Sequence, residues 1–169
     1  MENKAEKQDW AIPKLVKESN WEKFRDLRLR AVEDSPQAFG DTAQVTQLRT
    51  EVEWREWAKS AYQFVIENNN RYVSSVTLRQ DVDGIWIVNA AWTAPEFRGQ
   101  GLSRKLFKKV FEKAKELNVN GITLNVNALQ IEAIELYKDL GFEEKTRQSN
   151  QTMGDGSTYQ TITMEIQLP

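Results

Sequence analysis

Hydrophobic positions along this chain change period several times, and each change predicts a boundary between a helix and a strand. Apolar residues recur every three or four positions in four segments, which predicts helices over 20–35, 50–61, 102–117 and 131–140. Other stretches alternate apolar and polar residues or are rich in β-branched and aromatic residues, which predicts strands. These strands cover 10–17, 62–66, 72–79, 85–93 and 122–127, and two more close the chain, the last with apolar residues at 162, 164, 166 and 168.

Local signals support these boundaries. Ser35-Pro36 ends the first helix, because a residue before proline is disfavoured in the α region. Thr50 and Glu53 have the form of a capping box at the start of the second helix. Short polar connections at 68–70 and 81–84 join the three middle strands and predict an antiparallel meander.

The predicted order, β-α-α-β-β-β-α-β-α-β-β, indicates a mixed α/β fold. We expect a central, mixed but mostly antiparallel sheet of about seven strands flanked by four helices. The 169 residues are enough for one domain with a sizeable core and too few for two ordinary ones, and no linker or repeat divides them. We therefore expect a single domain over 1–169, with a loose start at 1–8.

Composition excludes several kinds of chemistry. The chain has no cysteine and no histidine, so Ser-His-Asp catalysis, a thiol nucleophile and zinc sites with these ligands are excluded. A net charge of -2 gives no reason to expect binding to nucleic acid or to a membrane surface, and no apolar run is long enough to span a bilayer. We expect a cytoplasmic protein without a bound metal, whose acid–base chemistry falls to carboxylates, lysine, tyrosine, backbone groups or water.

The most informative segment is a glycine-rich turn between a predicted strand and a long predicted helix. Gly99 and Gly101 allow backbone conformations that other residues avoid, and they let a ligand approach closely. The first amides of the following helix lack intrahelical partners and point outward, where the helix dipole favours an anion. The segment therefore predicts a phosphate cradle, although neither the dinucleotide fingerprint G-x-G-x-x-G nor the P-loop G-x-x-x-x-G-K-[ST] is present.

A tight turn without a ligand is the other interpretation of these glycines, since glycine pairs are common between strands and helices. Basic residues around the turn favour an anionic ligand instead. They are Arg98, Arg104, Lys105, Lys108 and Lys109. Further along the helix, a solvated face explains the charges equally well.

The turn resembles the cofactor motif of the GNAT superfamily, the acetyl-CoA-dependent N-acetyltransferases. The family signature R/Q-x-x-G-x-G/A is similar to residues 98–103, with Ser103 in place of the last Gly or Ala. A second family segment, N-x-x-A-x-x-L-Y-x-x-x-G-F, resembles residues 130–142. Its matching positions are Ala133, Leu136, Tyr137, Gly141 and Phe142. The order of the predicted elements is also similar, so the resemblance covers nearly the whole chain.

The resemblance implies an acetyl-CoA site built mostly from main-chain groups. The pyrophosphate is implied to lie on the turn, whose residues are Arg98, Gly99, Gln100, Gly101, Leu102 and Ser103. The pantetheine arm is implied to pair with the preceding strand through Ala91 and Thr93, whose backbone groups point to the same side. One amide of this strand is implied to polarise the thioester carbonyl. Gln130 stands where the family usually has an asparagine that contacts the cofactor.

Tyr137 is implied to be the catalytic residue, which protonates the departing thiolate. Because it lies in an apolar helical stripe with Leu136 and Leu140, packing in the core is the alternative role for this tyrosine. Some family members use a glutamate as general base where this chain has Asn125. The base is left unassigned, with Glu67, a water chain or an amine that arrives neutral as alternatives.

The predicted function is transfer of an acetyl group from acetyl-CoA to a primary amine of a small molecule or peptide by direct attack. The absence of cysteine and histidine fits this function, because direct transfer needs no covalent enzyme intermediate. A non-catalytic acyl-CoA-binding module, use of another acyl donor, and a nucleotide-binding protein of another fold are the alternatives.

The resemblance also places the acceptor pocket, at residues 34–42 and at the loop 146–157 before the last strand. Tryptophans at 54, 57, 86 and 92 are candidates for lining it or for the core. The residues do not identify the acceptor amine. A homodimer that forms through the final strand is a further possibility that the resemblance raises.

Overall fold

The structure is a computed structural model that describes residues 9–169, and for residues 147–149 it describes the backbone alone. The described residues form five α-helices: α1 (Trp21–Asp34), α2 (Ala43–Gln47), α3 (Glu51–Lys59), α4 (Leu102–Glu116) and α5 (Ile131–Asp139). They also form seven strands: β1 (Lys14–Leu15), β2 (Tyr62–Asn68), β3 (Arg71–Gln80), β4 (Trp86–Thr93), β5 (Gly121–Asn127), β6 (Glu143–Thr152) and β7 (Thr158–Gln167).

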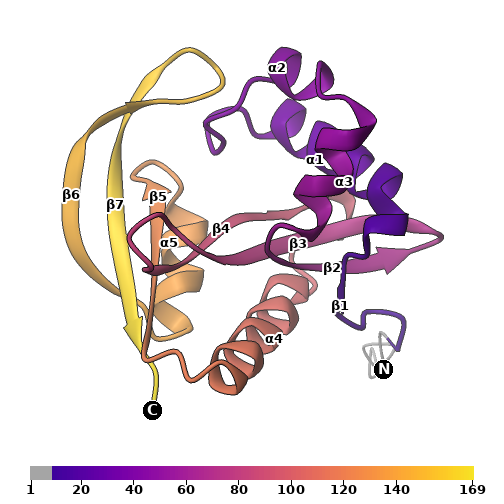
Figure 1. Ribbon diagram of the computed structural model, residues 1–169. Helices are drawn as coiled ribbons and strands as arrows, with labels where there is room; N and C mark the ends of the chain where they lie inside the picture. The colour runs from indigo at the N-terminus through magenta and orange to yellow at the C-terminus, as the bar shows by residue number, and fades with distance from the viewer. Residues whose placement is uncertain (1–8) are drawn as a thin grey trace, which may run out of the picture.

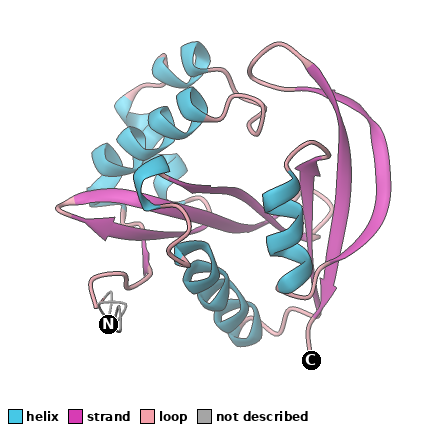
Figure 2. Ribbon diagram, turned by 180° about the vertical axis from the view of Figure 1, so that it is seen from behind, coloured by secondary structure: helices cyan, strands magenta, loops and turns pink. Residues whose placement is uncertain are grey.

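The strands make one mixed sheet in the order β1-β2-β3-β4-β5-β7-β6. Neighbouring strands are antiparallel except β4 and β5, which run parallel. Helices α1, α2 and α3 lie above the β2–β4 part of the sheet in Figure 1 and α4 lies below it, an arrangement also visible from behind (Figure 2). Helix α5 packs against α4 through Tyr137 and Phe107, whose ring centroids are 5.7 Å apart. The predicted α/β class and the mostly antiparallel sheet are confirmed.

The sheet divides between β4 and β5. Within the described residues these two strands pair at one position only, Ile87 with Thr123. Beyond that position they diverge, so that β1–β4 and β5–β7 run in different directions in Figure 1. The facing backbone groups of the two strands are therefore not used up in sheet hydrogen bonds with each other.

A β-bulge in β4 accounts for this divergence. Ser75 of β3 faces Trp92 and Thr77 faces Asn89, so two residues of β4 stand opposite one residue of β3. One of the two, Ala90, has a φ of 54°, in the left-handed region that alanine rarely adopts. Because a bulge bends its strand, the end of β4 turns away from β5.

Several local predictions from the sequence are confirmed. The Thr50 hydroxyl accepts a hydrogen bond from the Glu53 amide at 3.3 Å, and the Glu53 carboxylate accepts one from the Thr50 amide at 2.7 Å. These two bonds form the expected capping box of α3. Trp54 on this helix is a core residue, with 1% of its surface exposed.

Two predictions about secondary structure were wrong. The structure has a fifth helix, α2, which the sequence pattern hides because its five residues carry no apolar stripe and only Thr46 is buried. The segment 146–157, expected to be a loop, is mostly strand, since β6 continues to Thr152 and the turn spans 153–157. Strand β6 is polar and lies at the edge of the sheet, so alternation of apolar residues does not mark it.

Candidate active site

Two adjoining cavities lie where β4 and β5 diverge. Their volumes are about 460 and 520 Å³. Both are lined by Ala91, Trp92, Thr93, Arg98, Glu132, Ala133 and Tyr137. We call the two cavities together the central groove. It runs from the glycine turn before α4, past the end of β4, to the first turn of α5.

The glycine turn forms one end of the central groove. Gly99 and Gly101 have φ values of 73° and 78°, so both need the left-handed conformation that glycine adopts without strain. A Cβ atom added at either position would meet nothing within 4 Å, so both glycines face open space. Gly101 is also the N-cap of α4, and its carbonyl accepts the Lys105 amide at 3.2 Å. The amides of the first turn of α4 are thus directed at this space and fit an anionic group such as a pyrophosphate.

The side chain of Arg98 braces the turn. Its Nε donates a hydrogen bond to the Thr93 carbonyl at 2.9 Å, and its guanidinium forms an ion pair with Asp34 at the end of α1. Asp34 also accepts a hydrogen bond from Trp92 Nε1 at 2.9 Å. Partial burial opposes ionisation of Asp34, but the hydrogen bonds from Ser35, Trp92 and Arg98 outweigh it and hold the pKa of this carboxyl below its ordinary value. Arg98 therefore contributes its main chain to the groove and uses its side chain to fix the turn to α1.

The end of β4 presents backbone groups to the groove. The Ser74 hydroxyl donates to the Trp92 carbonyl at 3.1 Å and the Ala94 amide donates to the Val73 carbonyl at 2.8 Å, so residues 92 and 94 face β3. Because backbone groups alternate along a strand, those of Ala91 and Thr93 face the groove, where the Thr93 carbonyl already accepts the hydrogen bond from Arg98 Nε. A ligand with amide groups can pair with this free edge as an added strand would.

Tyr137 lies on α5 and lines both cavities. Its ring packs against Phe107 and Phe142, with centroid distances of 5.7 and 6.0 Å. The residue as a whole is half-buried, and desolvation by its surroundings raises the pKa of its phenol to about 12. The phenol is therefore neutral, and able to donate a proton, over the entire working range of an enzyme. Tyr137 thus packs against the aromatic cluster and also lines the groove, and its catalytic role stays a prediction.

Most of the sequence-predicted site residues come together here. Gln130 lines the cavity of about 520 Å³, at the start of α5. Gln100 lines neither cavity, and its side chain donates to the Glu96 carbonyl at 3.3 Å. Asn125 is exposed and accepts a hydrogen bond from Thr163 at 2.6 Å. Glu67 lies outside the groove and is paired with Lys14 and Lys23, which lower the pKa of its carboxyl.

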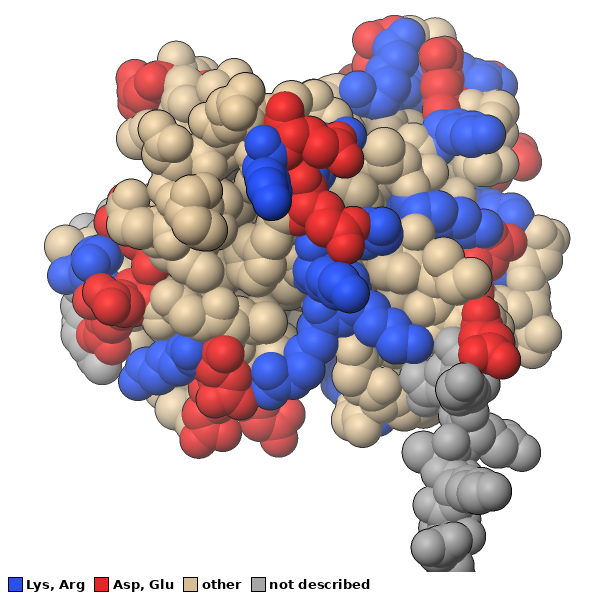
Figure 3. Space-filling model, turned by 90° about the horizontal axis from the view of Figure 1, so that it is seen from below, with Lys and Arg blue, Asp and Glu red and all other residues tan. Residues whose placement is uncertain are grey.

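The sequence did not single out Glu132, which lines both cavities from the first turn of α5. Helix α4 adds positive charge beside the groove. Arg104 lines it and pairs with Asp139 at 2.8 Å, and Lys and Arg side chains gather in a band on the face seen from below (Figure 3). This local charge suits an anionic ligand although the whole chain is slightly acidic.

The loop between α1 and α2 closes the other side of the groove. Ala38 and Phe39 line it, and the Gln37 carbonyl accepts a hydrogen bond from Asn127 Nδ2 at 3.0 Å. The turn between β6 and β7 holds the same loop, since the Gly154 amide donates to the Phe39 carbonyl at 2.7 Å. Both segments expected to border an acceptor pocket thus meet at Phe39.

A model of the acetyltransferase (GNAT) family matches residues 21–142, most of the chain and all of the groove. The chain belongs to this family. The resemblance seen in its two motifs is thereby confirmed, and this GNAT protein is a member of a family of acetyl-CoA-dependent acyltransferases.

Individual relatives agree with the family. An uncharacterized N-acetyltransferase of Methanocaldococcus jannaschii is 34% identical over 74 residues, which are 44% of this chain and 31% of that protein, so the match spans about a third of the relative. Among solved structures, a ribosomal-protein-alanine N-acetyltransferase of Brucella melitensis superposes with a TM-score of 0.74 at 19% identity, over 93% of this chain and 99% of that one. The YncA protein of Salmonella typhimurium, solved with its cofactor acetyl-CoA, has a TM-score of 0.76 at 15% identity over 93% of each chain. At these identities the solved structures show a shared fold.

In residues 9–169, no helix combines the length and the apolar character that crossing a bilayer requires. In the same residues, no group of three or more acidic side chains is placed to hold a metal ion.

Proposed function

We propose that this GNAT protein transfers an acetyl group from acetyl-CoA to a primary amine by direct attack. One observation carries the proposal: the glycine turn, the free edge of β4 and the phenol of Tyr137 line a single groove. Acetyl-CoA fits this donor set, because it has an anionic pyrophosphate, an arm with amide groups and a thioester at the end of that arm. Acetyl-CoA supplies the acyl group. The residues of this chain bind and orient acetyl-CoA and transfer a proton.

Each part of the groove has a distinct task in this proposal. The backbone amides of residues 98–103 hold the pyrophosphate at the start of α4. Ala91 and Thr93 pair with the arm and direct the thioester toward Tyr137. Gln130 adds an amide contact from the start of α5. Arg98 and Asp34 keep the turn and β4 in the positions that these contacts need.

Tyr137 is the proton donor in the proposed reaction. The amine nitrogen forms a bond with the acetyl carbon, the carbon–sulfur bond breaks, and the phenol gives its proton to the departing sulfur. A free thiol has a pKa near ~8.5, well below that of this phenol. The desolvation that raises the pKa of the phenol also raises the pKa of a thiol bound beside it. The attacking amine releases a proton as it becomes an amide, so the phenol is restored and no net proton is consumed.

Calorimetric titration with acetyl-CoA tests the binding part of the proposal. Gly101→Asp should abolish binding, because its carboxylate would project into the anion site. Gly84→Asp is the matched control: its φ of 80° is close to that of Gly101 and its Cβ also meets open space, but it lies in the turn before β4. Equal affinity of the two variants for acetyl-CoA would refute the cradle.

Release of free thiol in the presence of amines tests the catalytic part. Tight binding of acetyl-CoA without turnover of any amine would assign the chain as an acyl-CoA-binding module instead. Glu132 places a carboxylate at the groove, whereas Asn125 has none to offer.

A further inference from the structure

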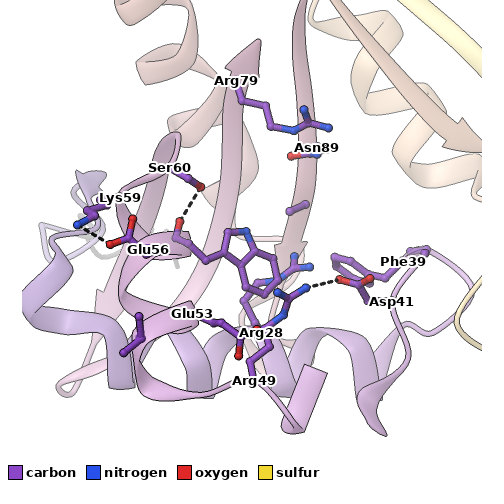
Figure 4. Close-up of a pocket in the computed structure, with 15 residues that line it drawn as sticks. Arg28, Phe39, Asp41, Arg49, Glu53, Glu56, Lys59, Ser60, Arg79 and Asn89 are labelled. Carbon is purple, nitrogen blue, oxygen red and sulfur yellow. Dashed lines mark hydrogen bonds and ion pairs between the residues drawn. The ribbon is translucent and has the colours of Figure 1, made fainter. Parts of the chain in front are cut away.

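A separate cavity of about 1020 Å³ lies next to the central groove, between α1, α3 and β4. Figure 4 shows it from close by, with Arg28 and Arg49 side by side and Asp41 and Phe39 facing them. We call it the arginine cavity. It shares Ala38 and Phe39 with the groove, and it is lined by Ala90 where the groove is lined by the next residue of β4, Ala91.

Arg28, which lines this cavity, is unusually buried for a charged residue. It lies on the buried face of α1 with Phe24 and Leu27, and only 7% of its surface is exposed. Its guanidinium carbon lies 4.8 Å from the ring centroid of Trp57 and 4.9 Å from that of Phe39. Two of its nitrogens, Nε and Nη1, have no hydrogen-bond partner among the described residues. A buried cation in this state is destabilising unless a negative charge compensates it.

The protein compensates this charge incompletely. Arg49 stacks on the same Trp57 ring at 4.4 Å and pairs with Asp41 at 3.9 Å. Asp41 is also the carboxylate that acts on Arg28, whereas Arg49 interacts in addition with Glu53. Desolvation, opposed by Asp41 and reinforced by Arg49, lowers the pKa of Arg28 to about 10, so the side chain still carries its charge at neutral pH.

The other charged groups that line the arginine cavity have partners. Glu53 is engaged in the capping box of α3, and Glu56 pairs with Lys59 at 2.9 Å. On the opposite wall, Arg79 donates a hydrogen bond to the Gln80 carbonyl at 3.3 Å. The buried guanidinium of Arg28, with two unpartnered nitrogens, thus stands at the end of the cavity that adjoins Phe39 and the groove.

We propose that Arg28, assisted by Arg49, binds the carboxylate of the acceptor, so that the substrate is an amine that also carries a carboxylate, as an amino acid does. A ligand carboxylate would accept hydrogen bonds from the unpartnered Nε and Nη1 of Arg28, and guanidinium groups suit planar carboxylates. With its carboxylate at Arg28, such an acceptor passes Phe39 and Ala90 and brings its amine to the end of β4. This inference rests on the proposed acetyl transfer, since it names the acceptor class of the same site.

Paired substrates separate the carboxylate from the amine. The probes are the common amino acids, each compared with its carboxamide, with release of free thiol from acetyl-CoA as the readout. The amine of a carboxamide is less basic than that of the acid, so a larger fraction of it is unprotonated and able to react at neutral pH. A preference for the acid therefore cannot come from amine reactivity. We expect at least one acid to have a kcat/KM more than 10-fold above that of its amide.

Arg28→Met removes the charge and keeps much of the volume. Loss of a charge-assisted contact should raise KM for the acid about 10- to 100-fold and bring the acid-to-amide ratio close to one. KM for the amide and the affinity for acetyl-CoA should stay unchanged. Arg49→Met, at a less buried position, should lower the same ratio by a smaller factor and serves if Arg28→Met does not fold. The matched control is Arg55→Met, because Arg55 also stacks on a tryptophan, Trp21 at 5.5 Å, but lies outside the cavity.

The outcomes distinguish this inference from the proposed function. Turnover with equal rates for acids and amides, or an acid preference that survives both arginine substitutions, would overturn the carboxylate site and leave acetyl transfer intact. If no amine is acetylated although acetyl-CoA binds, the proposed function fails. Calorimetry of the same acids and amides with CoA-loaded protein then tests the carboxylate site at Arg28 directly. Binding of an acid that Arg28→Met abolishes would still support the carboxylate site, and the absence of acid binding would refute that site.

Discussion

The contact between the β6–β7 turn and the loop after α1 provides a sharp test of how the acceptor side is held. A Cβ atom at Gly154 would lie 2.4 Å from the Asp41 carbonyl oxygen, 3.1 Å from its carbon and 3.2 Å from the Phe39 carbonyl oxygen. All three are backbone atoms, so no flexible side chain can move aside. Gly154→Ala must therefore push the turn and the loop apart by about 1 Å to reach ordinary van der Waals contact.

The expected loss of stability follows from this displacement. Overpacking costs about 1–3 kcal/mol, and the 2.7 Å hydrogen bond from Gly154 to Phe39 contributes about 1 kcal/mol more. Replacing glycine offsets about 0.4–1 kcal/mol through the unfolded state. The net destabilisation is about 1–4 kcal/mol, which corresponds to a fall in Tm of about 2–14 °C for a domain of this size.

Thermal unfolding of Gly154→Ala beside Gly40→Ala measures this effect. Gly40 lies in the loop after α1, its φ is not positive, and its added Cβ meets nothing within 4 Å, so Gly40→Ala should unfold near the wild-type temperature. If acetyl transfer takes place as proposed, Gly154→Ala should also raise KM for the acceptor and leave acetyl-CoA affinity unchanged. A Gly154→Ala protein as stable as Gly40→Ala would refute the tight contact.

Three further predictions concern the groove. Tyr137→Phe should lower kcat at least 10-fold with little change in acetyl-CoA affinity by calorimetry; an unchanged rate would leave the tyrosine with a packing role only. Because the pKa of Tyr137 is about 12, the pH–rate profile should show no alkaline decline from this group below about pH 10, and a decline near neutral pH that Tyr137→Phe removes would contradict its pKa. Asp34→Asn should destabilise the fold by about 1–2 kcal/mol at neutral pH, a value reduced by partial exposure. Since the folded-state pKa of Asp34 is lowered, its contribution is present above the ordinary value of 3.8 and is lost as pH falls through the folded pKa, so wild type and variant should converge in acid-unfolding measurements.

Features that depend on neighbouring residues were predictable from the sequence. The capping box at Thr50 needs only two residues three positions apart, and the glycine turn needs only positive φ at Gly99 and Gly101. The antiparallel pairing of β2 with β3 and of β3 with β4 followed from their short polar connections. The glycine turn and Tyr137 were predicted to share a site only through the resemblance, because they lie on separate elements joined by a helix and a strand.

Features that depend on distant residues were not predictable. Asp34 accepts hydrogen bonds from groups 58 and 64 positions away, and no local pattern marks such a contact. The arginine cavity was missed for a related reason, although a signal existed. Arg28 follows Phe24 by four positions and so interrupts the apolar face of α1 with a charge, but only the packing of α1 against Trp57 and Phe39 shows that the charge is buried.

The single register pair between β4 and β5 has a consequence for the integrity of the fold. Few backbone hydrogen bonds join the two halves of the sheet. A ligand arm that pairs with β4 would therefore take the place of a strand between them. Occupancy then becomes part of the folding equilibrium: at a ligand concentration 100 times its Kd, stability rises by about 2.7 kcal/mol. Under the proposed binding mode, resistance to thermal unfolding and to proteolysis therefore rises with the concentration of acetyl-CoA.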